Sequence, residues 1–184
     1  MGETWNVAPE NDANQIPGTG WFAAYQNTPT DSWWLIQDIN EGVVHYQFAF
    51  AVTNASGVQG GIILQRDIQK GEDWGAWEWV NPPMALGVEY RTTERYLGKP
   101  VYTKLVDFGA APNATTKIVN HGVANVDNVI SSSFSTVTYD KANLISHPAY
   151  QTMVVSPTII LIKTNDNKSD SNIYVAMKYT KTTD

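Results

Sequence analysis

The amino-acid sequence predicts an all-β protein, with a small β domain followed by an antiparallel β-sandwich. Helix signals are almost absent, because no long stretch places apolar side chains at helical spacing without Gly, Pro or runs of β-branched residues. Strand signals recur along the whole chain, as short aromatic or β-branched segments between turn-forming clusters. All seven tryptophans lie at or before Trp79. This distribution indicates two modules with different cores.

Five strands are expected in the first half, at residues 22–26, 33–39, 45–52, 62–66 and 74–80. The third has the clearest alternation. One of its faces is expected to carry Tyr46, Phe48, Phe50 and Val52, and the other His45, Gln47, Ala49 and Ala51. The two alanines would permit close approach of another layer.

A proline pair marks the expected domain boundary. Asn81, Pro82 and Pro83 end the run of strands, since two prolines remove two backbone donors and favour an extended chain. We place the boundary between residues 81 and 90. The tryptophan-rich domain is then expected over residues 1–84, with its core at about 15–83, and the sandwich over residues 85–184.

Seven strands are expected in the second half, with the short spacing and regular turns of a sandwich. They are residues 91–96, 101–108, 115–121, 128–138, 151–155, 159–164 and 173–180. The last strand should present Ile173, Val175, Met177 and Tyr179 on one face. The wholly polar stretch 165–172 is expected to form a hairpin tip between two apolar strands.

The charge distribution argues against nucleic acid as a partner and against membrane insertion. Residues 1–90 hold eleven acidic and two basic side chains, a net charge of −9, whereas residues 91–184 hold ten basic and seven acidic ones, a net charge of +3. A nucleic-acid interface needs a basic face. Membrane attachment needs a basic cluster or a long apolar run, and the sequence has neither.

The composition is typical of extracellular β proteins. Only 16% of the residues are charged, against about 25% in an average domain, and Asn, Thr, Ser and Gln take their place. There is no cysteine, so neither a disulfide nor a thiolate metal site can form. Residues 1–4 have neither the basic segment nor the apolar run of a signal peptide.

Catalytic and metal-binding patterns are not found. The three histidines lie on different predicted elements, and no serine lies in a Gly-x-Ser-x-Gly motif. Glu72, Asp73 and Glu78 lie near three tryptophans, as in a glycosidase, but solvation in a turn explains the first two. The stretch 165–172 fails as a calcium loop. We therefore expect no enzymatic activity, no metal and no cofactor.

The tryptophans could form either a sugar-stacking surface or a bulky core. Aromatic faces stack on the C–H surfaces of sugars, but a large buried indole with one donor is equally ordinary. We expect Trp21 and Trp77 in the core. Trp33 and Trp34 should point to opposite faces of their strand. Trp34 and Trp74 remain candidate ligand contacts.

The first half resembles the knob domain of R-type pyocin and phage tail fibres. The resemblance covers residues 15–83 and rests on four short segments in order. They are Trp-Leu-Ile-Gln at 34–37, Tyr-Gln at 46–47, Ile-Leu-Gln-Arg at 63–66 and Trp-Gly-Ala-Trp at 74–77.

The second half resembles the C-terminal module of phage tail-fibre and minor structural proteins of gut bacteria. The resemblance covers residues 88–184. It rests on Tyr-Arg-Thr-Thr-Glu-Arg-Tyr at 90–96, Gly-Lys-Pro-Val-Tyr-Thr-Lys at 98–104, Val-Asp-Phe-Gly at 106–109, Pro-Asn at 112–113, His-Gly at 121–122 and Lys-Tyr-Thr-Lys-Thr-Thr at 178–183.

The resemblance implies a structural and receptor-binding segment of a tail fibre, located on a virion or outside the cell. It implies a homotrimer whose C-terminal tip binds bacterial surface polysaccharide without cleaving it. Loops 165–172 and 139–150 are the expected receptor face, since loops carry recognition. The alternatives are a carbohydrate-binding module of a secreted glycosidase and a glycan-cleaving enzyme. The candidate ligand contacts are Trp34, Trp74, Tyr139, Tyr150, Asp166, Asn167, Asp170 and Asn172.

Overall fold

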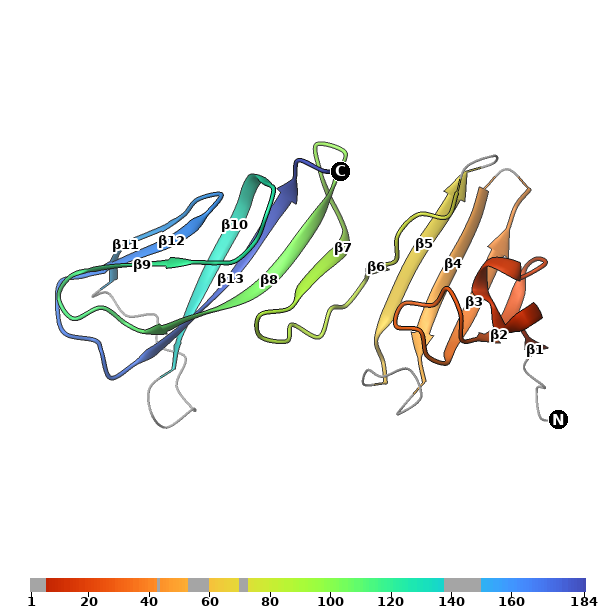
Figure 1. The fold of residues 1–184 in the computed structure, drawn as a ribbon, viewed down its shortest axis with the longest axis horizontal. Helices are drawn as coiled ribbons and strands as arrows, with labels where there is room; N and C mark the ends of the chain where they lie inside the picture. Colours follow the sequence, from red (N-terminus) through yellow and green to blue (C-terminus); the bar gives the residue numbers. More distant parts are fainter. Residues whose placement is uncertain (1–5, 43, 53–59, 70–72, 138–149) are drawn as a thin grey trace. The chain divides into compact units, whose positions relative to one another are not determined.

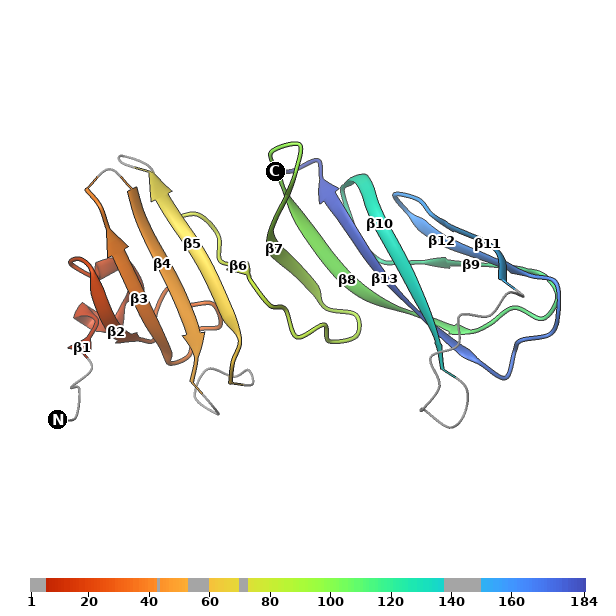
Figure 2. The ribbon, with the colours of Figure 1, turned by 180° about the vertical axis from the view of Figure 1, so that it is seen from behind.

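The computed structural model describes residues 6–42, 44–52, 60–69, 73–137 and 150–184. The chain divides into two compact units, Met1–Pro83 and Met84–Asp184 (Figures 1 and 2). Both units are built from strands, and the described residues outside them form loops and two short 3-10 turns. The predicted all-β class is confirmed.

The first unit is one twisted sheet with a short segment packed on one face. Its strands are hydrogen-bonded in chain order, β1 being parallel to β2 and the others antiparallel. They are β1 (Asn6–Val7), β2 (Gly20–Ala24), β3 (Trp34–Asn40), β4 (Val44–Ala51), β5 (Ile63–Gln69) and β6 (Glu78–Trp79). Two 3-10 turns, Pro9–Asn11 and Ala13–Gln15, lie between β1 and β2.

The core of the first unit lies between that N-terminal segment and one face of the sheet. Ala49 is fully buried on this face, as its alternation in β4 predicts, and its small side chain leaves room for the layer above. The buried apolar set is Ala8, Ala13, Ile16, Phe22, Ala24, Trp34, Ile36, Ala49 and Leu64. Trp77 and Trp79 pack against the edge of this set. On the opposite face of β4, Tyr46 is exposed, while Phe48 and Phe50 are half-buried.

The second unit contains two antiparallel sheets. The larger has the order β7 (Glu89–Tyr96), β8 (Lys99–Ala110), β13 (Asn172–Lys181) and β10 (Val126–Val137). The smaller has the order β11 (Tyr150–Val155), β12 (Ile159–Thr164) and β9 (Thr116–Asn120). Side chains of both sheets meet in one core, as in a sandwich.

The predicted inward face of the last strand is confirmed. Ile173, Val175, Met177 and Tyr179 are all 0% exposed. They pack with Ile160 and Ile162 of β12, which alternate with more exposed neighbours in the same way.

Candidate ligand-binding surfaces

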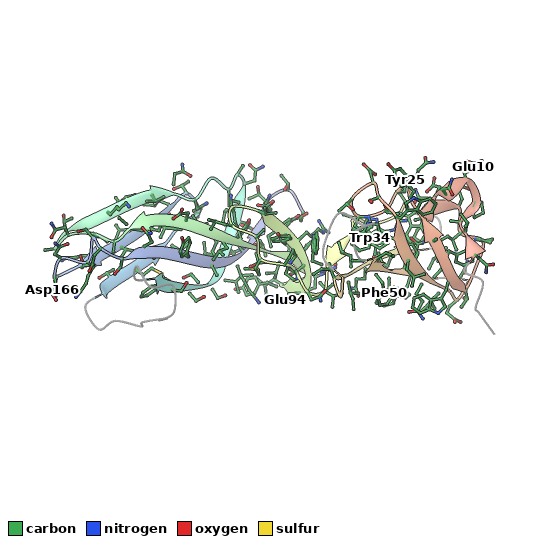
Figure 3. The ribbon with its side chains drawn as sticks, turned by 90° about the horizontal axis from the view of Figure 1, so that it is seen from below. Glu10, Tyr25, Trp34, Phe50, Glu94 and Asp166 are labelled. Carbon is green, nitrogen blue, oxygen red and sulfur yellow. The ribbon has the colours of Figure 1, made fainter. Side chains whose placement is uncertain are left out.

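The polar hairpin between β12 and β13 forms a tip of the second unit (Figure 3). Asp166, Asn167 and Asp170 are exposed there. The backbone of this tip is held by the neighbouring loop, because the Ala114 amide donates to the Asp166 carbonyl oxygen at 3.0 Å and the Lys168 amide to that of Pro112 at 3.2 Å. The tip therefore presents its carboxylates from a fixed backbone.

Asn167 stabilises the turn of the tip through hydrogen bonds within it. Its amide oxygen accepts hydrogen bonds from the Ser169 amide at 3.0 Å and from the Ser169 hydroxyl at 2.8 Å. Short side chains of this kind stabilise turns by bonding backbone two residues further on. Asn167 therefore orders the turn, while the Asp166 and Asp170 side chains are exposed.

The register of the strands places the residues that flank the segment 138–149 next to the polar tip. Val137, the last residue of β10, pairs with Asn172, the last of the candidate tip residues. Tyr150, the first residue of β11, pairs with Thr164, which immediately precedes the tip. Both flanks of the segment 138–149 therefore adjoin the tip. Tyr139 itself lies outside the described residues.

Two tryptophans, Trp21 of β2 and Trp34 of β3, lie in the opposite environments to those expected from the sequence. Trp34 is 0% exposed and donates its indole N–H to the Thr30 hydroxyl at 3.0 Å. It is a core residue, which removes it from the candidate ligand contacts. Trp21 is 44% exposed, so its predicted place in the core was wrong. Trp33 is 40% exposed, and its ring contacts that of Tyr25, with centroids 5.9 Å apart.

Trp74 belongs to a stack of side chains around Arg66. The Arg66 guanidinium carbon lies 4.3 Å from the ring centroid of Trp74 and 4.3 Å from that of Trp77. Trp74 also contacts the His45 ring, at 4.6 Å between centroids. The half-buried Trp74 thus packs against both Arg66 and His45. Its role as a ligand contact stays a prediction.

The same guanidinium anchors a buried polar network. Arg66 donates to the Gln47 side-chain oxygen, at 3.0 Å from Nε and 2.7 Å from an η nitrogen. Gln47 in turn donates to the buried Asp38 carboxylate at 2.8 Å. Burial lowers the pKa of Arg66 to about 10, and the carboxylates of Asp12 and Asp38 act in the opposite direction. His45 of β4 also contacts the Asp38 carboxylate, at 2.6 Å from its Nε2. The network therefore links β3, β4 and β5, and we assign it to stability.

Three of the four segments that resemble a tail-fibre knob contribute to this one cluster. Gln47, Arg66, Trp74 and Trp77 come from β4, from β5 and from the loop before β6. Their shared role is to fix the fold of the first unit.

The remaining candidate groups do not assemble into a catalytic centre within the described ranges. Glu78 is buried and Asp73 is exposed, while Glu72 lies outside the described residues. His45 and His121 are in different units. His121 is buried, its Nδ1 accepts from the Val123 amide at 3.1 Å, and burial lowers its pKa.

The part of the chain that the structure describes contains no group of three or more His, Cys, Asp or Glu side chains that could hold a metal ion. It also contains no helix long and apolar enough to cross a membrane.

Comparison with known proteins finds only distant likeness. No family model and no curated protein matches the chain. An N-truncated R2-type pyocin tail fibre aligns over 95% of this chain and 94% of its own, with 9% identity and a TM-score of 0.32. The C-terminal part of the R1 pyocin fibre of P. aeruginosa aligns over 96% of this chain and 66% of its own, with 9% identity and a TM-score of 0.30. Likeness at this level carries no conclusion about activity.

Proposed function

We propose that the chain is a structural and receptor-binding segment of a phage or phage-like tail fibre, on a virion or outside the cell. It binds bacterial cell-surface glycan without cleaving it. The resemblance of residues 15–83 and 88–184 to tail-fibre modules supports this proposal. The all-β construction of both units is compatible with such a role.

The observation that carries the proposal is the polar tip at one end of the second unit. The pairs Val137–Asn172 and Tyr150–Thr164 place both flanks of the segment 138–149 next to this tip. The loop at residues 111–115 is bonded to the tip through Pro112 and Ala114. Loops on a rigid β scaffold are where recognition residues concentrate, and exposed carboxylate and amide groups suit the hydroxyls of a glycan.

A homotrimer would suit both the stability and the affinity of such a segment. The chain has no disulfide to support its small units, and association is a common substitute. Three copies also present three tips, so weak contacts are strengthened by avidity. Light scattering should therefore give about three times the 20.4 kDa mass of one chain. A 20.4 kDa monomer at micromolar concentration would contradict the trimer.

The receptor role predicts a large effect from the tip carboxylates. The double variant Asp166→Ala, Asp170→Ala should weaken binding of the intact oligomer to an array of bacterial surface polysaccharides by about tenfold or more, since one lost charge-assisted hydrogen bond removes about 1.5–3 kcal/mol. Glu41→Ala with Asp73→Ala removes the same charge from exposed positions of the first unit and should change binding less than about twofold. Equal losses in both double variants would indicate a nonspecific charge effect and contradict the assignment.

A carbohydrate-binding module of a secreted glycosidase is the second candidate. One observation favours it, which is the exposure of Trp21 and Tyr46, 44% each, on one sheet of the first unit. Such a module would be monomeric and would bind soluble polysaccharide without the tip. Unchanged polysaccharide binding by a monomer that lacks both tip carboxylates would favour this candidate over the fibre.

A further inference from the structure

The first unit has an aromatic surface on the face of its sheet that points away from the core. Alternate residues of β2 to β5 lie on it, because successive side chains of a strand point to opposite faces. Figure 3 shows Phe50 and Trp34 on opposite sides of this sheet. We call this surface the outer face. It is made of Trp21, Ala23, Leu35, Gln37, Ile39, Tyr46, Phe48, Phe50, Ile63, Gln65 and Asp67.

The strand register arranges the outer face in rows. One row runs Trp21, Gln37, Phe48, Gln65 across four neighbouring strands, so aromatic rings alternate with amides. Rings in this row are two strands apart, about 9.5 Å. The Trp21 ring also contacts the Phe50 ring of the next row, at 5.3 Å between centroids. Trp21 and Phe50 thus form a continuous apolar platform, with half-exposed Tyr46 beyond it on the same face.

The charge of the first unit limits the classes of ligand that can bind the outer face. Among its eleven positions, Asp67 is the one carboxylate and none is a base, and Glu78 of β6 pairs with Gln65 at the end of the row. Residues 1–83 carry two bases and ten acids, a net charge of −8. Such a field disfavours anionic ligands and also a second copy of the same unit stacked on this face. A neutral ligand is compatible with this charge.

The side-chain amides of the outer face favour a sugar over an apolar protein surface as its ligand. Gln37 lies half-buried between Trp21 and Phe48, and the half-buried Gln65 lies between Phe48 and Glu78. Covering them with an apolar surface would cost the hydrogen bonds that they make with water. A sugar covers rings with its C–H face and offers hydroxyls to the amides at its edge. The alternation of rings and amides therefore matches a neutral oligosaccharide better than a flat apolar partner.

We propose that the outer face of the first unit is a binding platform for neutral polysaccharide, distinct from the tip of the second unit. Trp21 and Phe50 would stack on the sugar rings, and Gln37 would bind their hydroxyls. The inference rests on the proposed function only in taking a glycan as the ligand. It adds a site that keeps the fibre on a neutral glycan while the tips sample the receptor.

The test is titration of the intact chain with cellohexaose, chitohexaose and laminarihexaose, followed by calorimetry. At least one of these neutral probes should bind with a Kd between about 0.1 and 10 mM, as expected for a shallow site. Trp21→Ala should weaken that binding by about tenfold or more. Trp33→Ala is the matched control, because its indole is 40% exposed but contacts Tyr25 instead of Phe50. It should change the Kd less than about twofold.

The other outcomes are equally decisive. No binding of any of the three probes up to about 10 mM overturns the platform and leaves the receptor role of the tip standing. Loss of oligosaccharide binding in Asp166→Ala, Asp170→Ala but not in Trp21→Ala moves the site to the tip and also overturns it. If Trp21→Ala instead dissociates an oligomer in light scattering, a second copy covers the face and the sugar platform is wrong. Trp21→Phe retains a ring and should keep most of the binding.

Discussion

Replacing Arg66 by alanine is expected to lower the free energy of unfolding of the first unit by about 3–5 kcal/mol, because it leaves buried partners without their donor. Arg66 is 7% exposed, and its η nitrogen also donates to the Asn14 side chain at 2.7 Å. Its loss leaves the Gln47 side-chain oxygen without this donor and the fully buried Asp38 carboxylate without a nearby arginine. Denaturant unfolding followed by tryptophan fluorescence measures this, since all seven tryptophans belong to this unit.

Two further variants separate the network from a general effect of losing an arginine. Arg95→Ala removes an exposed guanidinium in the second unit and should change stability by less than about 1 kcal/mol. Arg66→Lys keeps the charge but loses the planar fork and the stacking on Trp74 and Trp77. It should therefore remain clearly destabilised. A cost below about 1 kcal/mol for Arg66→Ala would show that the network contributes little to the fold.

The strands were predictable because their signal is local. A two-residue period over residues 45–52 predicts which side chains of β4 share a face, and the buried Gln47 and Ala49 agree with it. The same period in β13 predicts the inward row from Ile173 to Tyr179, and the burial pattern confirms it. Each prediction needs only residues of one strand, so no knowledge of the partner strand is required.

The places of Trp21 and Trp34 could not be predicted in the same way. Alternation shows that neighbouring residues point to opposite faces, but it does not say which face is covered. The N-terminal segment with Ala8, Ala13 and Ile16 decides this by packing on one side of the sheet. That segment has no strand or helix periodicity, so the sequence gives no sign of where it lies.

The buried polar network around Arg66 could not be predicted from the sequence for a related reason. Arg66 and Asn14 are 52 residues apart in the sequence, and Gln47 and Arg66 are 19 apart. Only the register of β3, β4 and β5 brings Asp38, Gln47 and Arg66 into one cross-strand row. The polar tip is the opposite case. Its composition marks it as a loop, but only the pairs with Val137 and Tyr150 show which other segment adjoins it.

In the second unit, Tyr179→Ala is expected to lower the free energy of unfolding by about 3–5 kcal/mol, as for other large buried rings. Tyr179 is 0% exposed and stacks on the Tyr102 ring, with centroids 5.9 Å apart. Its hydroxyl donates to the Glu89 carboxylate at 2.5 Å. Burial and the neighbouring carboxylate raise the pKa of Tyr179, so the phenol stays a neutral donor.

The variant Tyr179→Phe isolates the hydroxyl from the ring. It should cost about 1–2 kcal/mol, because Glu89 keeps its ion pair with Lys181 and no cavity forms. Tyr174→Ala is the matched control on β13, since this half-buried ring points to the opposite face, and it should cost about 1 kcal/mol. Native-state amide exchange of β8 and β13 measures all three free energies without a tryptophan reporter. Equal costs for Tyr179→Phe and Tyr179→Ala would place the whole effect in the hydrogen bond to Glu89 and contradict a role of the ring in the core.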